Sequence, residues 1–394
     1  MTAAGIAFGL PRERADASPH RVAAGRAEWL PLGMVGAMHQ DWQALSRRAL
    51  EPNVFYDPAF ALAAAPVFGN PGAVLVWSKA GRLIGFFPCR IERRYGMMTA
   101  LTGWTHPYAP FGVPLVDRDE AEAAIAAFLD HVEANEKLPK LVMLPLIATD
   151  GAFAAALARV LLRHGGAMQR FGAHARALLA PTAERRAYLD DALSAKKLKD
   201  LRRQRRRLQD KGLLKLTSAR EAGDIPRALS DYLALEADGW KGRAGSAATQ
   251  HAAIRAFMQA ALGTLAAEGH ARIDSLMQNG RPLAAAITLR SGASAWFWKI
   301  AYDENFARHS PGVQVSLDVT ELLLADPGIA RADSCATAGH PMIDHLWRER
   351  LALSDLLIAP SAEALAQLHV ARHLETLRRA LISAAKFVRD NARR

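Results

Sequence analysis

Cysteine is scarce in this 394-residue sequence, which contains only Cys89 and Cys335. Two cysteines this far apart form neither a disulfide framework nor the clustered spacing of a zinc site, so we expect a reduced compartment, the cytoplasm, and no bound metal. No apolar run approaches the ~18 residues that a membrane-spanning helix needs. The first 20 residues also lack the apolar core of a secretory signal. These absences disfavour secreted, disulfide-stapled and membrane-spanning classes of protein.

What the sequence does contain is typical of globular domains. Hydrophobic residues make up 51% and charged residues 23% of the chain, so a folded body rather than general disorder is expected. A length of 394 residues exceeds what one compact core normally supports. The sequence therefore predicts two domains, at 36–185 and 190–394, preceded by a flexible tail at 1–35.

The positive charge is concentrated in one segment. Residues 196–211 read KKLKDLRRQRRRLQDK and carry a net +7, which leaves only +4 of the formal +11 for the rest of the chain. A local cluster argues against a specific DNA-binding surface. Three interpretations stay open: a solvated helix face docked through its leucines, a contact with a phosphate-bearing ligand or tRNA, and a peripheral contact with membrane headgroups. No aromatic residues are interleaved with the basic ones, which disfavours RNA.

Periodicity in the first half predicts strands and helices in alternation. Met38, Trp42 and Leu45 recur at helical spacing. Two apolar runs around Ala80-Gly81 predict a hairpin. The predicted elements are a helix at 38–48, strands at 73–78 and 82–94, an irregular and potentially functional stretch at 102–115, a helix at 118–135, a strand at 141–147 and a helix at 151–164. This order indicates a mixed α/β sheet.

A polar, proline-containing stretch at 171–190 predicts the boundary between the domains. Asn279-Gly280 is a strong two-residue hairpin signal in the second half. The predicted elements there are a basic helix at 193–210, a strand at 213–219, helices at 225–239 and 247–268, strands at 271–278, 282–290 and 294–302, a helix from Pro311, a short strand at 330–335, a helix at 342–350, a strand at 354–360 and a helix at 362–390.

The most informative unit is the strand, loop and helix at 294–325. Ser310 suits a helix N-cap and Pro311 suits the first helical position. The start of such a helix exposes backbone N–H groups and attracts phosphate, and Arg308 stands beside it. The exposed groups would belong to Gly312, Val313 and Gln314. An ordinary capped helix is the competing interpretation. No Walker or dinucleotide fingerprint occurs here, which argues against kinases, NTPases and nicotinamide enzymes.

Four segments in a fixed order carry a family resemblance. They read AKKLKDLRRQRRRLQDKG, LALEADGWKGRAGSA, WFWKIAYDENFARHSPGVQV and GHPMIDHLWRER. In this order they resemble the CelD-like group of the GNAT acetyltransferase superfamily, which is similar to Fem-type aminoacyltransferases. The resemblance implies two tandem GNAT-like domains, transfer from acetyl-CoA or another acyl-CoA, and a link to exopolysaccharide or cellulose production. The usual pyrophosphate loop of the superfamily differs from 308–313, where the one glycine comes a position late.

Direct acyl transfer needs a base for the acceptor and a donor for the leaving thiolate. The resemblance places the carbonyl beside the backbone of 298–301. Tyr302 is the expected thiolate donor, and the base candidates are Asp303, His340 and Asp344. Each has a structural alternative: Asp303 an Asx turn, His340 a packed loop residue, and Asp344 a helix cap.

Three further residues are expected near the acceptor. Trp240 and Lys241 follow a helix with an acidic end, and Lys299 interrupts an apolar strand. The competing interpretations are a helix C-cap at Gly242 with a buried tryptophan, and an ordinary core strand.

Taken together, the sequence predicts an α/β acyltransferase whose acceptor is a small molecule or saccharide, with sugar, amino sugar and amine acceptors all open. Two alternatives remain. One is a Fem-like transferase that uses aminoacyl-tRNA, and the other is a non-catalytic scaffold for polysaccharide synthesis.

Overall fold

The computed structural model describes residues 25–95, 98–181, 185 and 187–391. Residues 1–24 of the expected tail lie outside this part of the chain. Residues 27–35 of that expected tail instead form strand β1 (Ala27–Pro31) and helix α1 (Leu32–Val35). Leu32 and Val35 are buried, and β1 pairs antiparallel with β2 (Gly72–Trp77), so packing and backbone hydrogen bonds hold this segment against the body.

The first half contains the helices and strands that periodicity predicts, together with α3, β4, β5 and β7, which it does not predict. Trp42 and Leu45 are fully buried and fix one face of α2. Asp57 caps α3 through a hydrogen bond from the Ala59 backbone N–H. The elements are α2 (His39–Arg47), α3 (Pro58–Ala64), β3 (Leu83–Tyr95), β4 (Met98–Gly103), β5 (Leu115–Val116), α4 (Ala121–Ala134), β6 (Val142–Ala148), α5 (Ala152–His164) and β7 (Ala167–Leu179).

The second half repeats this kind of order around a second group of strands. Its elements are α6 (Tyr188–Ala192), α7 (Ala195–Gln209), β8 (Leu214–Ala219), α8 (Ile225–Asp238), α9 (Trp240–Arg243), α10 (Ala252–Ala267), β9 (Ala271–Gln278), β10 (Arg281–Ser291), β11 (Ser294–Tyr302), α11 (Pro311–Ala325), β12 (Arg331–Asp333), β13 (Glu349–Ala359) and α12 (Leu365–Asn391). Short 3-10 helices lie at Glu304–His309 and Ile343–His345.

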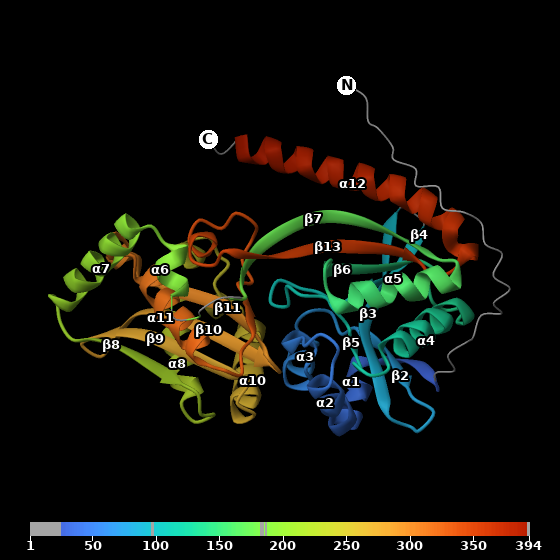
Figure 1. The fold of residues 1–394 in the computed structure, drawn as a ribbon, viewed down its shortest axis with the longest axis horizontal. Helices are drawn as coiled ribbons and strands as arrows, with labels where there is room; N and C mark the ends of the chain where they lie inside the picture. Colours follow the sequence, from blue (N-terminus) through green and yellow to red (C-terminus); the bar gives the residue numbers. More distant parts are fainter. Residues whose placement is uncertain (1–24, 96–97, 182–184, 186, 392–394) are drawn as a thin grey trace.

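The described strands join into one mixed sheet of 13 strands, with the order β1-β2-β3-β4-β6-β13-β7-β12-β11-β10-β9-β8 and β5 beside β3. The pairs β4–β6 and β11–β12 are parallel, whereas the others are antiparallel. Strand β13, near the end of the sequence, lies between β6 and β7 of the first half. Figure 1 shows the two groups of strands side by side, with the long β7 and β13 bridging them.

Two predictions about local structure are wrong. The stretch at 171–190, predicted as a loop-like boundary, begins with the second half of β7. Its polar residues stand in a strand because β7 pairs with both β13 and β12. The helix predicted at 342–350 is absent: a single 3-10 turn at Ile343–His345 precedes β13, which already starts at Glu349. Pairing with β7 over its whole length decides this segment in favour of a strand. The predicted domain limits themselves stay a prediction.

Aromatic side chains from both halves share one core. Phe60 of α3 packs edge-on against Phe257 of α10 and Trp298 of β11, at ring distances of 5.2 and 5.6 Å. Phe55 packs against Trp296 in the same way. This shared core fixes β11, and therefore its far end, relative to the first half of the chain.

Within the described residues, no helix combines the length and the apolar character that crossing a bilayer requires.

Candidate active site

A pocket opens where two parallel strands separate. β11 and β12 pair only over Ser294–Trp296 and Arg331–Asp333. Beyond Trp296 the strand β11 continues to Tyr302, whereas the chain after Asp333 turns away through Ser334 and Cys335. The space between them is a cavity of about 530 Å³, closed at one end by the start of α11.

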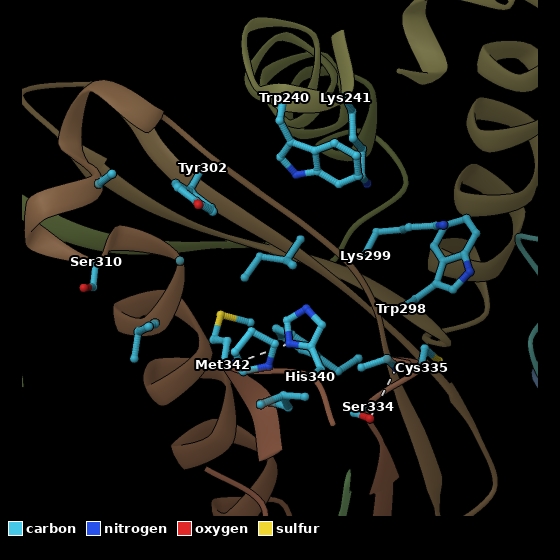
Figure 2. A pocket seen from close by; sticks show the side chains of 18 residues that line it. Trp240, Lys241, Trp298, Lys299, Tyr302, Ser310, Ser334, Cys335, His340 and Met342 are labelled. Carbon is cyan, nitrogen blue, oxygen red and sulfur yellow. Dashed lines mark hydrogen bonds between the residues drawn. The ribbon is translucent and has the colours of Figure 1, made fainter. Parts of the chain in front are cut away.

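Figure 2 shows how side chains from separate segments face this cavity. Trp240 and Lys241 reach in from α9, His340 and Met342 lie across from them, and Tyr302 and Lys299 come from β11. The lining thus combines aromatic rings, two cations and an imidazole in one partly open space. The full lining is Trp240, Lys241, Phe297, Trp298, Lys299, Ile300, Tyr302, Ala307, Ser310, Gly312, Val313, Ser334, Cys335, Ala336, His340, Pro341, Met342 and Ile343.

The start of α11 borders the cavity through its backbone. Ser310 precedes the helix in a left-handed conformation with φ of 51°, a geometry that costs a non-glycine residue about 1 kcal/mol or more. Pro311 occupies the first helical position as predicted, but the Ser310 side chain does not cap the helix. The carbonyl of Ser310 accepts from the Gln314 N–H at 3.0 Å, so the N–H groups of Gly312 and Val313 precede the first backbone hydrogen bond of the helix, and both residues line the pocket.

Gly312 matters for space as well as for hydrogen bonding. A Cβ atom at this position would come within 2.9 Å of the Tyr302 ring carbon Cδ1. Only glycine therefore lets the ring of Tyr302 lie flat against the start of α11. The end of β11 and the start of α11 are therefore in direct contact where both border the cavity.

Two other residues predicted at the helix start lie elsewhere. The Gln314 side chain is buried and donates from Nε2 to the Leu201 carbonyl of α7 at 3.0 Å. Arg308 is exposed outside the cavity lining and donates from Nε to His309. The structure thus brings Ser310, Gly312 and Val313 together at the pocket and turns Gln314 toward the basic helix.

Of the four residues predicted to move protons, two line the cavity. They are Tyr302 and His340. The Met342 backbone N–H points to Nδ1 of His340 at 3.3 Å, so the neutral ring carries its proton on Nε2. His340 consequently presents a donor rather than a base in its neutral form.

Asp303 and Asp344 lie outside the lining. Asp303 is buried, accepts from the Asn305 N–H at 2.9 Å and pairs with Arg281 at 3.3 Å, which is the Asx-turn alternative. Asp344 lies within the 3-10 helix at Ile343–His345 and does not cap it, with Arg350 4.0 Å away.

Two lysines give the cavity its charge. Lys299 lies with Nζ 4.1 Å from the centre of the Tyr108 ring, and burial lowers its pKa to about 8, with Lys241 adding to the effect. Lys241 pairs with buried Glu236 at 2.8 Å. The Glu236 carboxylate also accepts from the Ala248 N–H at 2.9 Å, so it anchors the segment after α9.

Trp240 is the one tryptophan in the cavity that faces solvent, with 59% of its surface exposed. Its backbone N–H donates to Glu304 at 2.7 Å, which ties α9 to the loop after β11. The alternative of a buried tryptophan at a helix C-cap is therefore wrong. An exposed indole at a cavity rim offers a flat apolar surface to a ligand.

Sequence reasoning missed the loop opposite β11. Cys335 lines the cavity with φ of 53°, and burial raises the pKa of its thiol. Asp333 fixes this loop: it accepts from the Cys335 N–H at 2.9 Å and forms a buried ion pair with Arg176 of β7. Arg176 also donates to the Pro110 carbonyl at 2.9 Å. The polar Arg176 within β7 was the available signal, since a buried arginine implies a buried anion.

A separate group of side chains has the chemistry of a metal site. Ligand atoms of Asp57, Glu268 and His270 lie within 4.8 Å of one another. Two of these residues, Glu268 and His270, border a second cavity of about 530 Å³ at the opposite end of the second group of strands. None of these three residues lines the pocket at α11, so a metal ion held by them would lie outside that pocket.

Comparison with known proteins identifies a domain model that matches most of the pocket lining, up to the residue before His340. Residues 195–339 match the family model described as an acetyltransferase (GNAT) domain. This match includes β11, the start of α11 and the loop at Cys335. No curated protein matches the sequence.

Solved structures resemble a larger part of the chain. FemX is 10% identical, with a TM-score of 0.56 over 84% of this chain and 98% of FemX. The C-terminal (DUF2156) domain of a protein described as a lysylphosphatidylglycerol synthetase from Agrobacterium fabrum is 14% identical, with a TM-score of 0.51 over 87% of this chain and 96% of that domain. A tandem GNAT protein from the clavulanic acid biosynthesis pathway is 14% identical, with a TM-score of 0.41 over 85% of this chain and 98% of its own.

These likenesses concern the fold. The predicted mixed α/β architecture is confirmed, and FemX and the DUF2156 domain share this fold over most of the chain. The match of residues 195–339 to a GNAT domain model supports transferase activity in general, whereas the likeness to FemX concerns the fold alone.

Proposed function

We propose that this protein is an acyl-CoA-dependent acyltransferase that moves an acyl group, such as acetyl, onto an amine or hydroxyl. The observation that carries the proposal is the start of α11, where Gly312 and Val313 precede the first backbone hydrogen bond of the helix and line a cavity that overlaps the matched GNAT domain. A helix N-terminus with free amides favours a diphosphate, and acyl-CoA carries one next to its pantetheine arm.

The residues at the cavity fit such a donor. Gly312 lets a ligand approach the helix backbone, and Ser310 adds a hydroxyl at the same edge. The apolar side chains of Ile300, Val313 and Met342 suit the arm that follows the diphosphate. When bound, acyl-CoA supplies an activated acyl thioester, and the residues of this chain orient it and manage protons.

Three side chains at the cavity are positioned to donate or accept the protons that acyl transfer moves. His340 presents Nε2–H and Tyr302 presents its hydroxyl, so each suits donation to a developing negative charge. Lys299, with its pKa lowered to about 8, is partly neutral near physiological pH. We assign to neutral Lys299 the acceptance of the proton from the attacking amine or hydroxyl, in preference to Asp303 and Asp344.

The acceptor would enter past Trp240 and Lys241. An exposed indole beside a cation suits a saccharide or another small polar molecule, because the ring covers its apolar face and Lys241 binds a hydroxyl or an anion. A saccharide acceptor agrees with the CelD-like resemblance and its link to exopolysaccharide production. We also retain the cytoplasm as the proposed location.

Binding of acetyl-CoA tests the donor site directly. Isothermal titration calorimetry of the full chain should show saturable binding of acetyl-CoA, and Gly312→Asp should weaken it tenfold or more, about 1.4 kcal/mol. Gly312→Ala is the matched control, since it displaces Tyr302 without adding a negative charge. Affinity in Gly312→Asp equal to that in Gly312→Ala would contradict an anion at this helix start.

Transfer from aminoacyl-tRNA is a second candidate. The fold likeness to FemX and the exposed cations of α7, which include Lys196, Lys199 and Arg203, favour it. Turnover that depends on charged tRNA, with no response to acetyl-CoA, would select this candidate. If the protein shows no activity with either acetyl-CoA or aminoacyl-tRNA, a non-catalytic scaffold would be the remaining candidate.

A further inference from the structure

The long helix α12 displays a row of large apolar side chains to solvent. Ten large hydrophobic side chains are exposed in the described part of the chain, and five of them lie on α12. Val370, Leu374, Leu377 and Leu381 form the row, and Ile382 lies on the same face as Ala371 and Glu375. Isolated exposed hydrophobic residues are common, but a row of this size on one helix marks a contact surface.

The row occupies the side of α12 that points away from the body. Leu368, Ala371 and Glu375 are buried and fix the inner face of the helix. Residues 370, 374, 377 and 381 repeat at intervals of four, three and four, which places them together on a separate face, about 120° around the helix from the buried one. Figure 1 shows α12 along the outer edge of the molecule, beyond β13 and β7. The apolar row is therefore outermost.

The charge of this segment indicates what covers the row. Residues 365–394 contain seven Arg and Lys residues but only Glu375 and Asp390 as acids. Buried Glu375 is paired with Arg378 and Arg379 at 2.6 Å, so it adds no negative charge to the outer surface. A second copy of the helix would bring like charges together. A surface of anionic lipid headgroups complements both the cations and the apolar row.

We propose that α12 attaches the protein to an anionic membrane surface, lying in the plane of the interface with Leu377 and Leu381 in the acyl boundary. At about 1.5 Å per residue, its 27 residues would cover roughly 40 Å of that surface. The body then stands on the membrane through one helix, and the proposal does not depend on the chemistry at α11.

Vesicle co-sedimentation of the full chain tests this proposal. The protein should bind vesicles of phosphatidylcholine mixed with phosphatidylglycerol, bind pure phosphatidylcholine weakly, and lose binding as salt rises. The variant carrying Leu377→Asp and Leu381→Asp should bind at least about tenfold more weakly, because it removes two apolar side chains from the acyl boundary and places two negative charges against the anionic headgroups. Both side chains are exposed, so the fold does not need them.

Leu162→Asp on α5 is the control, since Leu162 is 83% exposed and lies outside the row. Its vesicle binding should equal that of the wild type. Equal loss in the control, or unchanged binding in the α12 variant, would overturn the proposal. Sedimentation velocity without lipid distinguishes membrane binding from dimer formation. A wild-type dimer that is absent in the α12 variant, together with no vesicle binding, would overturn the proposal and assign the row to a second copy of the chain.

Discussion

Acid should destabilise this protein through His106. This residue follows β4 in the irregular stretch beside the candidate site, with its ring stacked on Phe68 at 4.0 Å. Its Nδ1 faces the Tyr108 N–H at 3.4 Å, and its Nε2 is buried without a hydrogen-bond partner. Burial, followed by the charges of Lys299 and Arg90, lowers the pKa of His106 to about 3.

The sign and size of the effect follow from proton binding. The unfolded chain takes up a proton on His106 near pH 6.5, whereas the folded protein resists it until about pH 3. The stabilisation is therefore complete above pH 6.5 and is lost as the pH falls toward 3. Each pH unit between these limits removes about 1.4 kcal/mol from the free energy of unfolding. At pH 4.5 the loss from this one residue is about 2–3 kcal/mol.

Urea unfolding of the wild type and of His106→Phe at pH 7.5 and pH 4.5 measures this loss. Phenylalanine keeps the stacking on Phe68 but binds no proton, so it cancels the contribution of His106 while other groups still titrate. The variant should lose about 2–3 kcal/mol less than the wild type between the two pH values. An equal loss in both proteins would refute the burial argument for His106.

Three further predictions concern the site and its supports. The rate of acyl transfer by the wild type should rise as the pH passes about 8, where Lys299 loses its proton. Lys299→Met should abolish this limb of the pH–rate profile. A limb that persists in the variant would mean that another residue is the base. Arg176→Ala should lower the free energy of unfolding by about 3–5 kcal/mol in denaturant titration, because it leaves Asp333 buried without its counter-ion, and added Asp333→Asn should recover part of the loss. Gln314→Leu should speed amide hydrogen exchange in α7, because it removes the hydrogen bond to the Leu201 carbonyl. The affinity for acetyl-CoA should stay unchanged, and a weaker affinity would show that Gln314 contributes to donor binding.

Local signals predicted much of the fold because they act over a few residues. Asn279 and Gly280 both adopt positive φ, of 49° and 82°, in the turn between β9 and β10, as the hairpin signal requires. Pro311 likewise marks the start of α11 correctly. Strand β13 was mispredicted at its start because its pairing partners, β6 and β7, lie about 200 residues earlier in the chain.

The candidate site divides in the same way. The strand end at Tyr302 and the helix start at Gly312 are neighbours in sequence, and the structure brings both to the cavity. The role of Cys335 could not be predicted, because Arg176, which fixes its loop through Asp333, lies 157 residues from that aspartate. The place of Asp303 outside the cavity lining could not be predicted for a related reason: its partner Arg281 comes from the neighbouring strand β10.

The position of β13 has a consequence for how the protein is made. While the ribosome synthesises the chain, β6 and β7 emerge some 170 residues before the strand that must separate them. Until β13 is synthesised, the edges of β6 and β7 that pair with it have unpaired backbone groups, and exposed strand edges of this kind promote aggregation. Maturation of the first half must therefore be delayed until synthesis is almost finished, and fragments that end before Glu349 should be insoluble.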